Sequence, residues 1–275
     1  MVKMFKSDGY SIPEPLVILT GGGTDDWRKI SEYHVEMYRR YAPLNHDDFV
    51  LEVGCGVGRD AIQLTKILSD KGKYVGFDII KPSIDWCKQN ITKKYKNFSF
   101  RYYDIKSQIH NSGGTLSTSD IKLPAKDKSV DRILLHSVFT HMFENDILHY
   151  LKEFHRVLKD DGLVLTSFFV IDDAALKSLA KGKSKGRHAL HFKHKLNKDC
   201  YINDPDYPEG AVGYTPRKIR SMLRKSGLGL HGRFAHRGAW AGMDGSNGQD
   251  VMILEKVSPA EAIVQSAQVL KFTTR

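Results

Sequence analysis

Apolar residues through the middle of the chain follow two periods, one typical of buried strands and one typical of amphipathic helices. Short apolar runs predict five strands, at about residues 50–53, 74–80, 98–105, 129–136 and 163–171. Helical patterns lie between them, and the clearest runs from Glu144 to Lys159 before Asp160-Asp161-Gly162. The alternation from residue 48 to residue 171 predicts a doubly wound α/β sheet with right-handed crossovers.

The chain before residue 45 follows a different pattern. Residues 9–23 contain two prolines and the run Gly21-Gly22-Gly23, which predicts an irregular segment. Thr24-Asp25-Asp26 then caps a helix that continues through Tyr38 with apolar residues at helical spacing. We expect this helix to pack against the edge of the sheet rather than to contact a substrate.

The alternation breaks again after residue 171. Residues 181–198 carry seven Lys or Arg and no acid, and residues 199–209 are acidic and aromatic. With Gly182 and Gly186 as flexible points, this stretch is predicted to be a cap that closes over bound ligands. A solvated basic loop is the plainer alternative.

Beyond the cap the sequence returns to a regular pattern. Thr215-Pro216 opens a helix that Gly227 closes, and two final strands are predicted at 228–234 and 250–256. The chain is therefore predicted to comprise an irregular segment with a helix (1–44), an α/β core (45–171), a cap insertion (172–213), the C-terminal part of the core (214–257) and a short tail (258–275).

The turn after the first predicted strand carries the strongest sign of chemistry. Glu52 near the strand end is followed by glycines at 54, 56 and 58, and a helical pattern begins at Asp60. Glycines allow a sharp turn and let a ligand approach main-chain N–H groups. A dinucleotide-binding G-x-G-x-x-G would need its third glycine at position 59, where Arg59 stands instead.

The next two predicted strands also end at acids. Asp78 lies near the end of the second strand, where it is placed to accept hydrogen bonds from both hydroxyls of a ribose. A helix N-cap is the alternative role for this side chain. Asp104 ends the third strand and is predicted to accept an adenine amino group, while the N–H of Ile105 reaches the ring.

Composition narrows the class of protein. A chain of 275 residues that is 41% hydrophobic and 27% charged can bury a full core. Cysteines 55, 87 and 200 have neither metal-ligand nor disulfide spacing, so we expect no metal site and a reduced, cytoplasmic protein. No apolar run is long enough for a signal or a membrane span. The net charge of +10 allows an anionic partner.

The glycine turn, Asp78, Asp104 and the runs 129–131 and 153–162 together resemble the class I S-adenosylmethionine (SAM) methyltransferases across residues 45–257. The runs 74–78, 137–142 and 249–250 look like a bacterial group implied in methylating sugars or secondary metabolites. The resemblance implies a Rossmann-like seven-stranded sheet in the order 3-2-1-4-5-7-6, with strand 7 antiparallel, and SAM as the cofactor. The cofactor-binding residues that it implies are Glu52, Gly54, Cys55, Gly56, Gly58, Arg59, Asp78, Ile79, Asp104, Ile105, His136 and Ser137.

The loop after the fourth strand bears on the methyl acceptor. Enzymes that methylate nucleobase amines usually carry an Asn- or Asp-Pro-Pro-aromatic run there, whereas this chain reads His136-Ser137-Val138-Phe139. An imidazole, with an ordinary pKa of about 6.5, can take a proton from a hydroxyl. His141 is therefore the predicted catalytic base, with His136 as its competitor.

These residues predict O-methylation of a hydroxylated small molecule, such as a sugar or a glycan, and no nucleic-acid partner. RNA and natural products are the alternative acceptors, because a pI near 9.3 permits RNA binding. A SAM-binding protein that has lost its chemistry is a further alternative.

Overall fold

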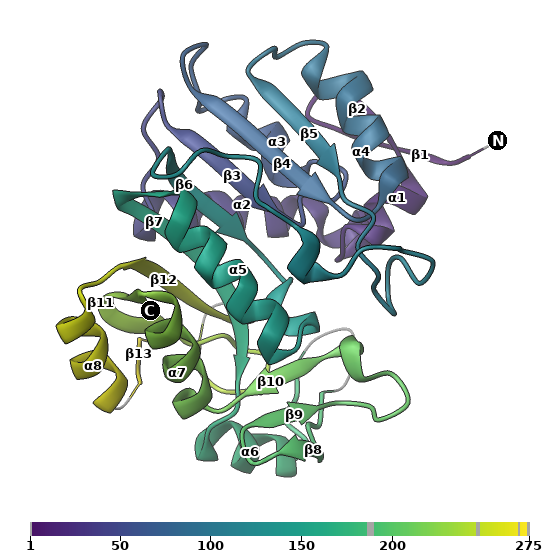
Figure 1. Cartoon of the computed structure of the whole chain (residues 1–275). Helices are drawn as coiled ribbons and strands as arrows, with labels where there is room; N and C mark the ends of the chain where they lie inside the picture. Colours follow the sequence, from purple (N-terminus) through teal and green to yellow (C-terminus); the bar gives the residue numbers. More distant parts are fainter. Residues whose placement is uncertain (1, 186–189, 246–247, 269, 274–275) are drawn as a thin grey trace. The chain divides into compact units, whose positions relative to one another are not determined.

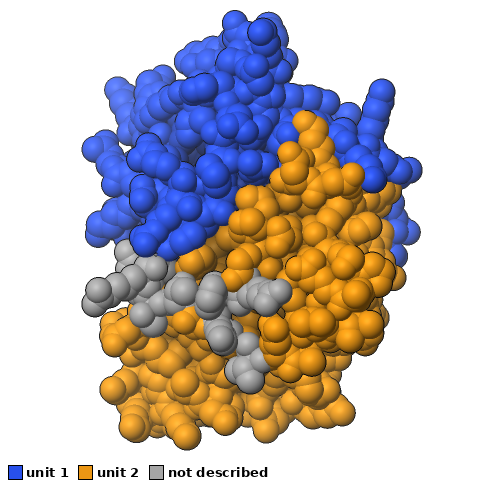
Figure 2. All heavy atoms as spheres, turned by 90° about the vertical axis from the view of Figure 1, so that its left-hand side faces the viewer, with its two compact units in different colours: residues 1–134 blue, residues 135–275 orange. Residues whose placement is uncertain are grey.

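The computed structural model describes residues 2–185, 190–245, 248–268 and 270–273. The chain divides into two compact units, residues 1–134 and residues 135–275, which Figure 2 shows in different colours. Each unit is described by itself below, with the element labels of Figure 1. Within the described ranges, no helix has the length and apolar character needed to cross a membrane.

A sheet with the predicted order forms the centre of the first unit. Its strands run in the order β6-β3-β4-β5, and β4 is parallel to both β3 and β5. They are β3 (Phe49–Val53), β4 (Lys73–Asp78), β5 (Phe98–Tyr102) and β6 (Val130–Leu135). Nearly every residue of β3 and β4 is buried, which explains their continuous apolar runs.

Helices follow the strands as the sequence predicts. The helices of this unit's core are α2 (Gly23–Tyr41), α3 (Arg59–Leu64) and α4 (Lys81–Cys87), and α4 continues as a π-helical turn, η1 (Lys88–Thr92). The N-cap of α2 is Gly22 and makes no side-chain cap bond, so the predicted cap at Thr24-Asp25-Asp26 is wrong. The polar stretch 106–124 is a loop with one 3-10 turn, η2 (Thr118–Asp120).

The prediction of an irregular segment at residues 9–23 is wrong for most of its length. An antiparallel hairpin forms between β1 (Met4–Ser7) and β2 (Tyr10–Pro13), and α1 (Glu14–Leu19) follows directly. Asp8 and Gly9 both adopt positive φ angles and close the hairpin in two residues. Pro15 lies in the first turn of α1, where its missing N–H costs no helical hydrogen bond.

The second unit contains a mixed sheet. Its strands are β7 (Leu158–Val170), β12 (Asp250–Lys256), β11 (Leu228–His236) and β13 (Lys271–Thr273), paired in that order. The β12 strand is antiparallel to both β7 and β11. This is the predicted 5-7-6 order with an antiparallel seventh strand, and it confirms that part of the fold. The parallel strand β13 beside β11 was not predicted.

Helices of the second unit show how capping signals fix their ends. They are η3 (Phe139–His141), α5 (Glu144–Val157), α7 (Pro216–Ser226) and α8 (Pro259–Ala267). Thr215 caps α7, and Gly227 ends it in the left-handed conformation, as predicted. The predicted boundary after α5 is wrong, because β7 begins at Leu158 and contains Asp160-Asp161-Gly162, of which the two acids are exposed.

The stretch 172–213 has its own small sheet and core. Its elements are α6 (Asp173–Ala180), β8 (His194–Asn197), β9 (Cys200–Ile202), η4 (Pro208–Gly210) and β10 (Val212–Tyr214). The β10 strand pairs with both β7 and β9, so this segment extends the sheet of the second unit. The rings of Phe169, Phe192 and Trp240 meet with centroids 5.0–5.4 Å apart. Gly186, predicted as a flexible point, lies outside the described residues.

Candidate functional site

The turn after β3 needs glycine at three positions. Gly54, Gly56 and Gly58 have φ angles of 74°, 53° and 78°, in the left-handed region that disfavours other residues. The N–H groups of Gly54 and Cys55 both donate to the Phe77 carbonyl, at 2.9 and 3.1 Å. The turn is therefore anchored to the end of the neighbouring strand β4.

Close packing adds a second requirement at two of these glycines. A Cβ atom at Gly56 would lie 2.5 Å from Cγ2 of Thr20, and one at Gly58 would lie 2.7 Å from Cδ1 of Ile91. Both distances are far below van der Waals contact, so neither site has room for a side chain. The side chains of Thr20 and Ile91 therefore pack directly against the backbone of the turn.

The N-terminal segment contacts this turn directly. Oγ1 of Thr20 accepts the N–H of Val57 at 3.0 Å, and the Arg59 guanidinium donates to the Gly21 carbonyl at 2.9 Å. The same guanidinium lies over the ring of Trp27 on α2, 5.6 Å from its centroid. The sequence predicted no role for Thr20 and Gly21, because no local pattern links them to residues 37 and 38 positions later.

Asp78 at the end of β4 fixes the turn from the other side. One carboxylate oxygen accepts the N–H of Gly56 at 2.6 Å, and the other accepts the N–H of Ile80 at 2.9 Å. Burial raises the pKa of Asp78, while hydrogen bonds from the backbone oppose that rise. In this structure the carboxylate ties the glycine turn to the segment after β4, and it makes no side-chain cap bond to α4.

Two more buried acids lie beside the turn. Glu52 on β3 accepts a hydrogen bond from the hydroxyl of Tyr74 at 2.5 Å. Asp60 on α3 accepts from Nδ1 of His34 at 2.7 Å and from the hydroxyl of Tyr38. Burial and, after it, the nearby Asp60 carboxylate raise the pKa of Glu52 well above its usual range.

Glu52, Asp60 and Asp78 thus form a buried acidic cluster, each no more than 7% exposed. Such a cluster is complementary to a cationic ligand, because a positive charge would offset the desolvation of the carboxylates. The sequence contained one sign of the pair formed by Asp60 and His34. Both are polar residues on the mostly apolar buried faces of their helices.

Asp104, two residues after β5, is held by the loop that follows it. It accepts hydrogen bonds from the Tyr102 hydroxyl at 2.6 Å, the Asn111 amide at 3.0 Å and the Thr115 hydroxyl at 2.8 Å. These bonds, that of Tyr102 first, lower the pKa of Asp104 to about 2. The adjacent Ile105 is buried. Asp104 is therefore an ionised acceptor whose orientation the loop controls.

In the second unit, His136 and Ser137 directly follow β6. Ser137 has a φ angle of 56°, a strained value for a residue with a side chain. Its hydroxyl accepts from the Gln249 amide at 2.8 Å, and its N–H donates to the Ser167 hydroxyl at 2.9 Å. Ser167 in turn donates to the Gln249 carbonyl oxygen at 2.6 Å. A polar network therefore fixes the loop, and Gln249 and Ser167 are members that the sequence did not reveal.

His141 ends the short helix η3 and is partly buried. Its Nδ1 lies 2.8 Å from the carbonyl oxygen of Glu209 in η4. His141 is therefore connected to the cap segment. At the start of α6, the side chain of Asp172 caps the helix by accepting the N–H of Ala175.

A family model described as a methyltransferase domain matches residues 44–227, which is more than half of the chain. This chain belongs to the methyltransferase-domain family. This membership agrees with the resemblance of its sequence to the class I SAM-dependent methyltransferases, whose cofactor is SAM. The match begins just before β3 and ends at the C-cap of α7, so it includes both the glycine turn and the cap segment.

The known proteins that this chain resembles are distant relatives, with sequence identities of 12–27%. The chain is 27% identical over 183 residues to the uncharacterized protein MJ1252 of Methanocaldococcus jannaschii, in a match that covers 66% of this chain and 61% of that protein. The structure of PH0226 protein from Pyrococcus horikoshii OT3 is 15% identical with a TM-score of 0.54, and the match covers 86% of this chain and 93% of that one.

A second similar structure is that of Haemonchus contortus phosphoethanolamine N-methyltransferase 1, in complex with phosphoethanolamine and S-adenosylhomocysteine. It is 12% identical with a TM-score of 0.53, and the match covers 91% of this chain and 49% of that chain. At these identities the two structural matches show the fold, and the match to MJ1252 spans less than two thirds of that protein. The acceptor of this methyltransferase therefore has to be argued from its own residues.

The residues of the first unit fit the cofactor of the family. SAM carries a positive sulfonium and a positive ammonium group, and the buried acidic cluster of Glu52, Asp60 and Asp78 provides the complementary charge. The assignments of individual residues to the amino acid, the ribose and the adenine stay predictions.

We expect SAM binding to release protons. A carboxyl whose pKa is raised by burial keeps its proton to higher pH, and a bound ammonium group would favour the ionised form. SAM affinity should therefore rise with pH across the range in which Glu52 and Asp78 titrate in the free protein. Calorimetric titration in buffers of different ionisation enthalpy measures the protons released. The same binding enthalpy in every buffer would contradict the expectation.

Proposed function

We propose that this enzyme methylates a hydroxyl group of a small molecule, most plausibly a sugar or a glycan, with His141 as the base. The observation that carries the proposal is the contact between Nδ1 of His141 and the Glu209 carbonyl. A carbonyl oxygen only accepts hydrogen bonds, so Nδ1 must carry the proton. In the neutral ring Nε2 is then a proton acceptor, as a general base requires.

The chemistry of methyl transfer explains why such a base matters. SAM, when bound, supplies a methyl group on a positively charged sulfur. An alcohol oxygen is a poor nucleophile until its proton begins to leave, and a positioned base typically contributes about a hundred- to ten-thousand-fold in rate. The ordered loop from Ser137 to His141, held by Gln249 and Ser167, supports a positioning role for this segment.

The aromatic residues of the cap segment differ in whether they can reach an acceptor. Tyr201 and Phe192 are buried in its core, so they are not available to stack on a sugar. Tyr207 is 41% exposed, and it precedes the turn whose carbonyl contacts His141. We therefore propose Tyr207 as the aromatic residue of this segment that meets the acceptor.

RNA is the second candidate acceptor, and one observation favours it. The described lysines of the basic stretch all have exposed side chains: Lys181, Lys183, Lys185, Lys193, Lys195 and Lys198. Against RNA, the buried Phe192 removes an aromatic ring from the basic surface. A filter-binding titration decides between the two, because phosphate contacts lose affinity steeply as salt rises.

Replacement of His141 by alanine should lower kcat about a hundredfold or more while SAM affinity stays within about twofold. The low-pH limb of the wild-type rate profile, which reports protonation of the base, should disappear. The acceptor is first found by following labelled methyl groups from SAM into a fractionated cell extract, and the same fraction is then used for every variant.

His136→Ala is the matched control, because His136 lies in the same loop and is predicted to serve SAM binding instead. It should weaken SAM binding and leave the pH profile in place. Wild-type turnover in His141→Ala, combined with loss of turnover in His136→Ala at unchanged SAM affinity, would reverse the two roles. A product methylated on nitrogen would overturn the proposed acceptor class.

A further inference from the structure

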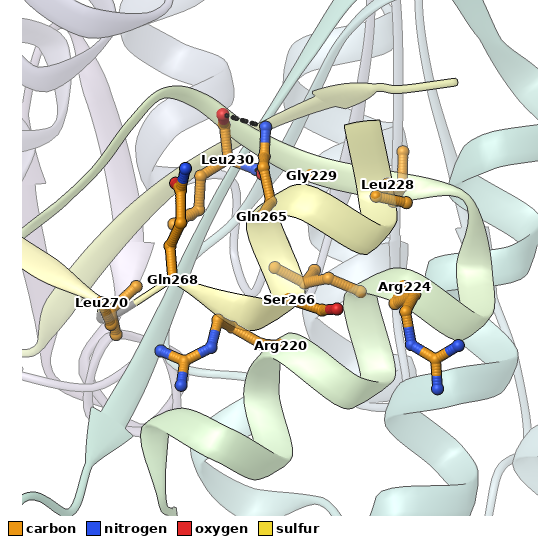
Figure 3. Close-up of a pocket in the computed structure, with 11 residues that line it drawn as sticks. Arg220, Arg224, Leu228, Gly229, Leu230, Gln265, Ser266, Gln268 and Leu270 are labelled. Carbon is orange, nitrogen blue, oxygen red and sulfur yellow. Dashed lines mark hydrogen bonds between the residues drawn. The ribbon is translucent and has the colours of Figure 1, made fainter. Parts of the chain in front are cut away.

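A pocket in the second unit lies among α7, β11, α8 and the segment before β13 (Figure 3). The cavity has a volume of about 20 Å³ and opens to solvent. One part of its lining is apolar and buried, and comprises Leu223, Leu228, Leu230, Ala262 and Leu270. The other part is polar, and comprises Arg220, Arg224, Gln265, Ser266 and Gln268. No acidic residue is among the described residues that line it.

Arg220 is the unusual member of this lining. Its Nε and Nη1 atoms are buried, and neither has a hydrogen-bond partner among the residues that the structure describes. Arg220 as a whole is partly exposed, but these two N–H groups are shielded from water and make no hydrogen bond in return. Desolvation also lowers the pKa of Arg220. Buried charges are normally paired, because an unpaired one costs free energy.

The other polar residues do not compensate this charge. Both polar atoms of the Gln265 amide bond the backbone of Leu230, where its oxygen accepts the N–H at 2.8 Å and its nitrogen donates to the carbonyl. The Ser266 hydroxyl donates to the Ile263 carbonyl at 2.8 Å. Figure 3 shows the Arg220 guanidinium on the side of Gln268 and Leu270, while Arg224, one turn further along α7, adds a second positive charge.

We propose that this pocket binds the carboxylate or phosphate group of a small molecule, which pairs with Arg220 while the rest of the ligand lies at the open mouth. The planar guanidinium presents donors that match both kinds of oxyanion. The leucines of the lining are already buried by the protein, so the cavity accepts little more than the head group. The site lies outside the residues assigned to SAM or to the acceptor, so the inference does not depend on the proposed O-methylation.

Calorimetric titration of the full chain with hexanoate, hexyl phosphate and hexanol tests this inference. Either anion should bind, and the comparison between them identifies the preferred head group, while hexanol should bind at least tenfold more weakly than the better anion. Arg220→Leu should weaken the binding of that anion by about tenfold to a hundredfold, the usual range for a charged hydrogen bond. Lys225→Gln, a charge removal on α7 outside the pocket lining, should leave the affinity unchanged.

A stability measurement separates this role from a purely structural one. Arg220→Leu removes two buried N–H groups that have no hydrogen-bond partner among the described residues, so the free variant should unfold at the wild-type temperature or above. The better anion should raise the Tm of the wild type and not that of the variant. If Arg220→Leu does not fold, Arg220→Lys, which keeps the charge and loses the planar fork, should bind with intermediate affinity. Absence of binding by both anions, or equal binding by wild type and variants, would overturn the inference.

Discussion

We expect Gly56→Ala to abolish SAM binding at concentrations that saturate the wild type, and to destabilise the protein. Gly56 has a φ angle of 53°, where an L-residue with a side chain costs about 1–2 kcal/mol. The new Cβ would also lie 2.5 Å from Cγ2 of Thr20, so the turn or the N-terminal segment must move. Because the Gly56 N–H is bound to Asp78, that movement would reach the end of β4 as well.

Gly113→Ala is the control for this substitution. A Cβ at Gly113 would meet no atom within 4 Å, and its φ angle lies outside the left-handed region. It should therefore change neither SAM affinity nor the free energy of unfolding. Calorimetry with SAM and urea denaturation of both variants measure the two effects. A Gly56→Ala protein that binds SAM within threefold of the wild type would show that the turn is not the cofactor site.

The largest effect on stability is expected for Asp250→Ala in the second unit. The Asp250 side chain is fully buried and accepts hydrogen bonds from the Val170 N–H, the Gly238 N–H and the indole of Trp240. Its loss leaves these three buried donors without this acceptor. It also removes a carboxylate beside Arg237, which keeps its pair with Asp172. Together these losses should cost about 3–5 kcal/mol. Asp161→Ala, on an exposed part of β7, should change stability by less than about 0.5 kcal/mol.

The titration of Asp250 should make the free energy of unfolding fall as pH rises. Burial, opposed by Arg237, raises its pKa from 3.8 to about 6, so the folded state binds this proton more tightly than the unfolded state. The contribution to stability is complete below pH 3.8 and is lost as pH rises through 6, by about 3 kcal/mol in total. The free energy of unfolding of Asp250→Asn, measured by urea denaturation between pH 4 and 7, should not show this loss. An unchanged pH dependence in the variant would refute the assignment.

Periodicity was sufficient to predict the strands of the core, whereas their order in the sheet was implied by the resemblance to the methyltransferase family. Continuous apolar runs mark strands that are buried on both faces, and short connections limit the topologies that can join them. The spacing of Gly54, Gly56 and Gly58 before a helix was equally informative, because few other structures need three such residues. Caps such as Thr215 and Gly227 were predictable for a similar reason, since their chemistry is local.

Features that depend on contacts distant in sequence were not predictable in this way. The bond between Thr20 and Val57, and the pairing of His34 with Asp60, join residues that no local pattern connects. The N-terminal hairpin was missed because Pro13 and Pro15 were taken as signs of irregular structure, although proline suits the start of a helix. The burial of Phe192 likewise depends on Trp240 and Phe169, which approach it only in the folded chain.

The central claim is that the glycine turn and Asp78 form the SAM site, and calorimetry with SAM on the wild type and on Asp78→Ala tests it most directly. The wild type should bind one SAM per chain. Asp78→Ala should bind at least tenfold more weakly, because the variant loses both the predicted ribose acceptor and the bond that holds the Gly56 N–H. Equal affinity of the two folded proteins for SAM, or no binding by the wild type, would contradict the account.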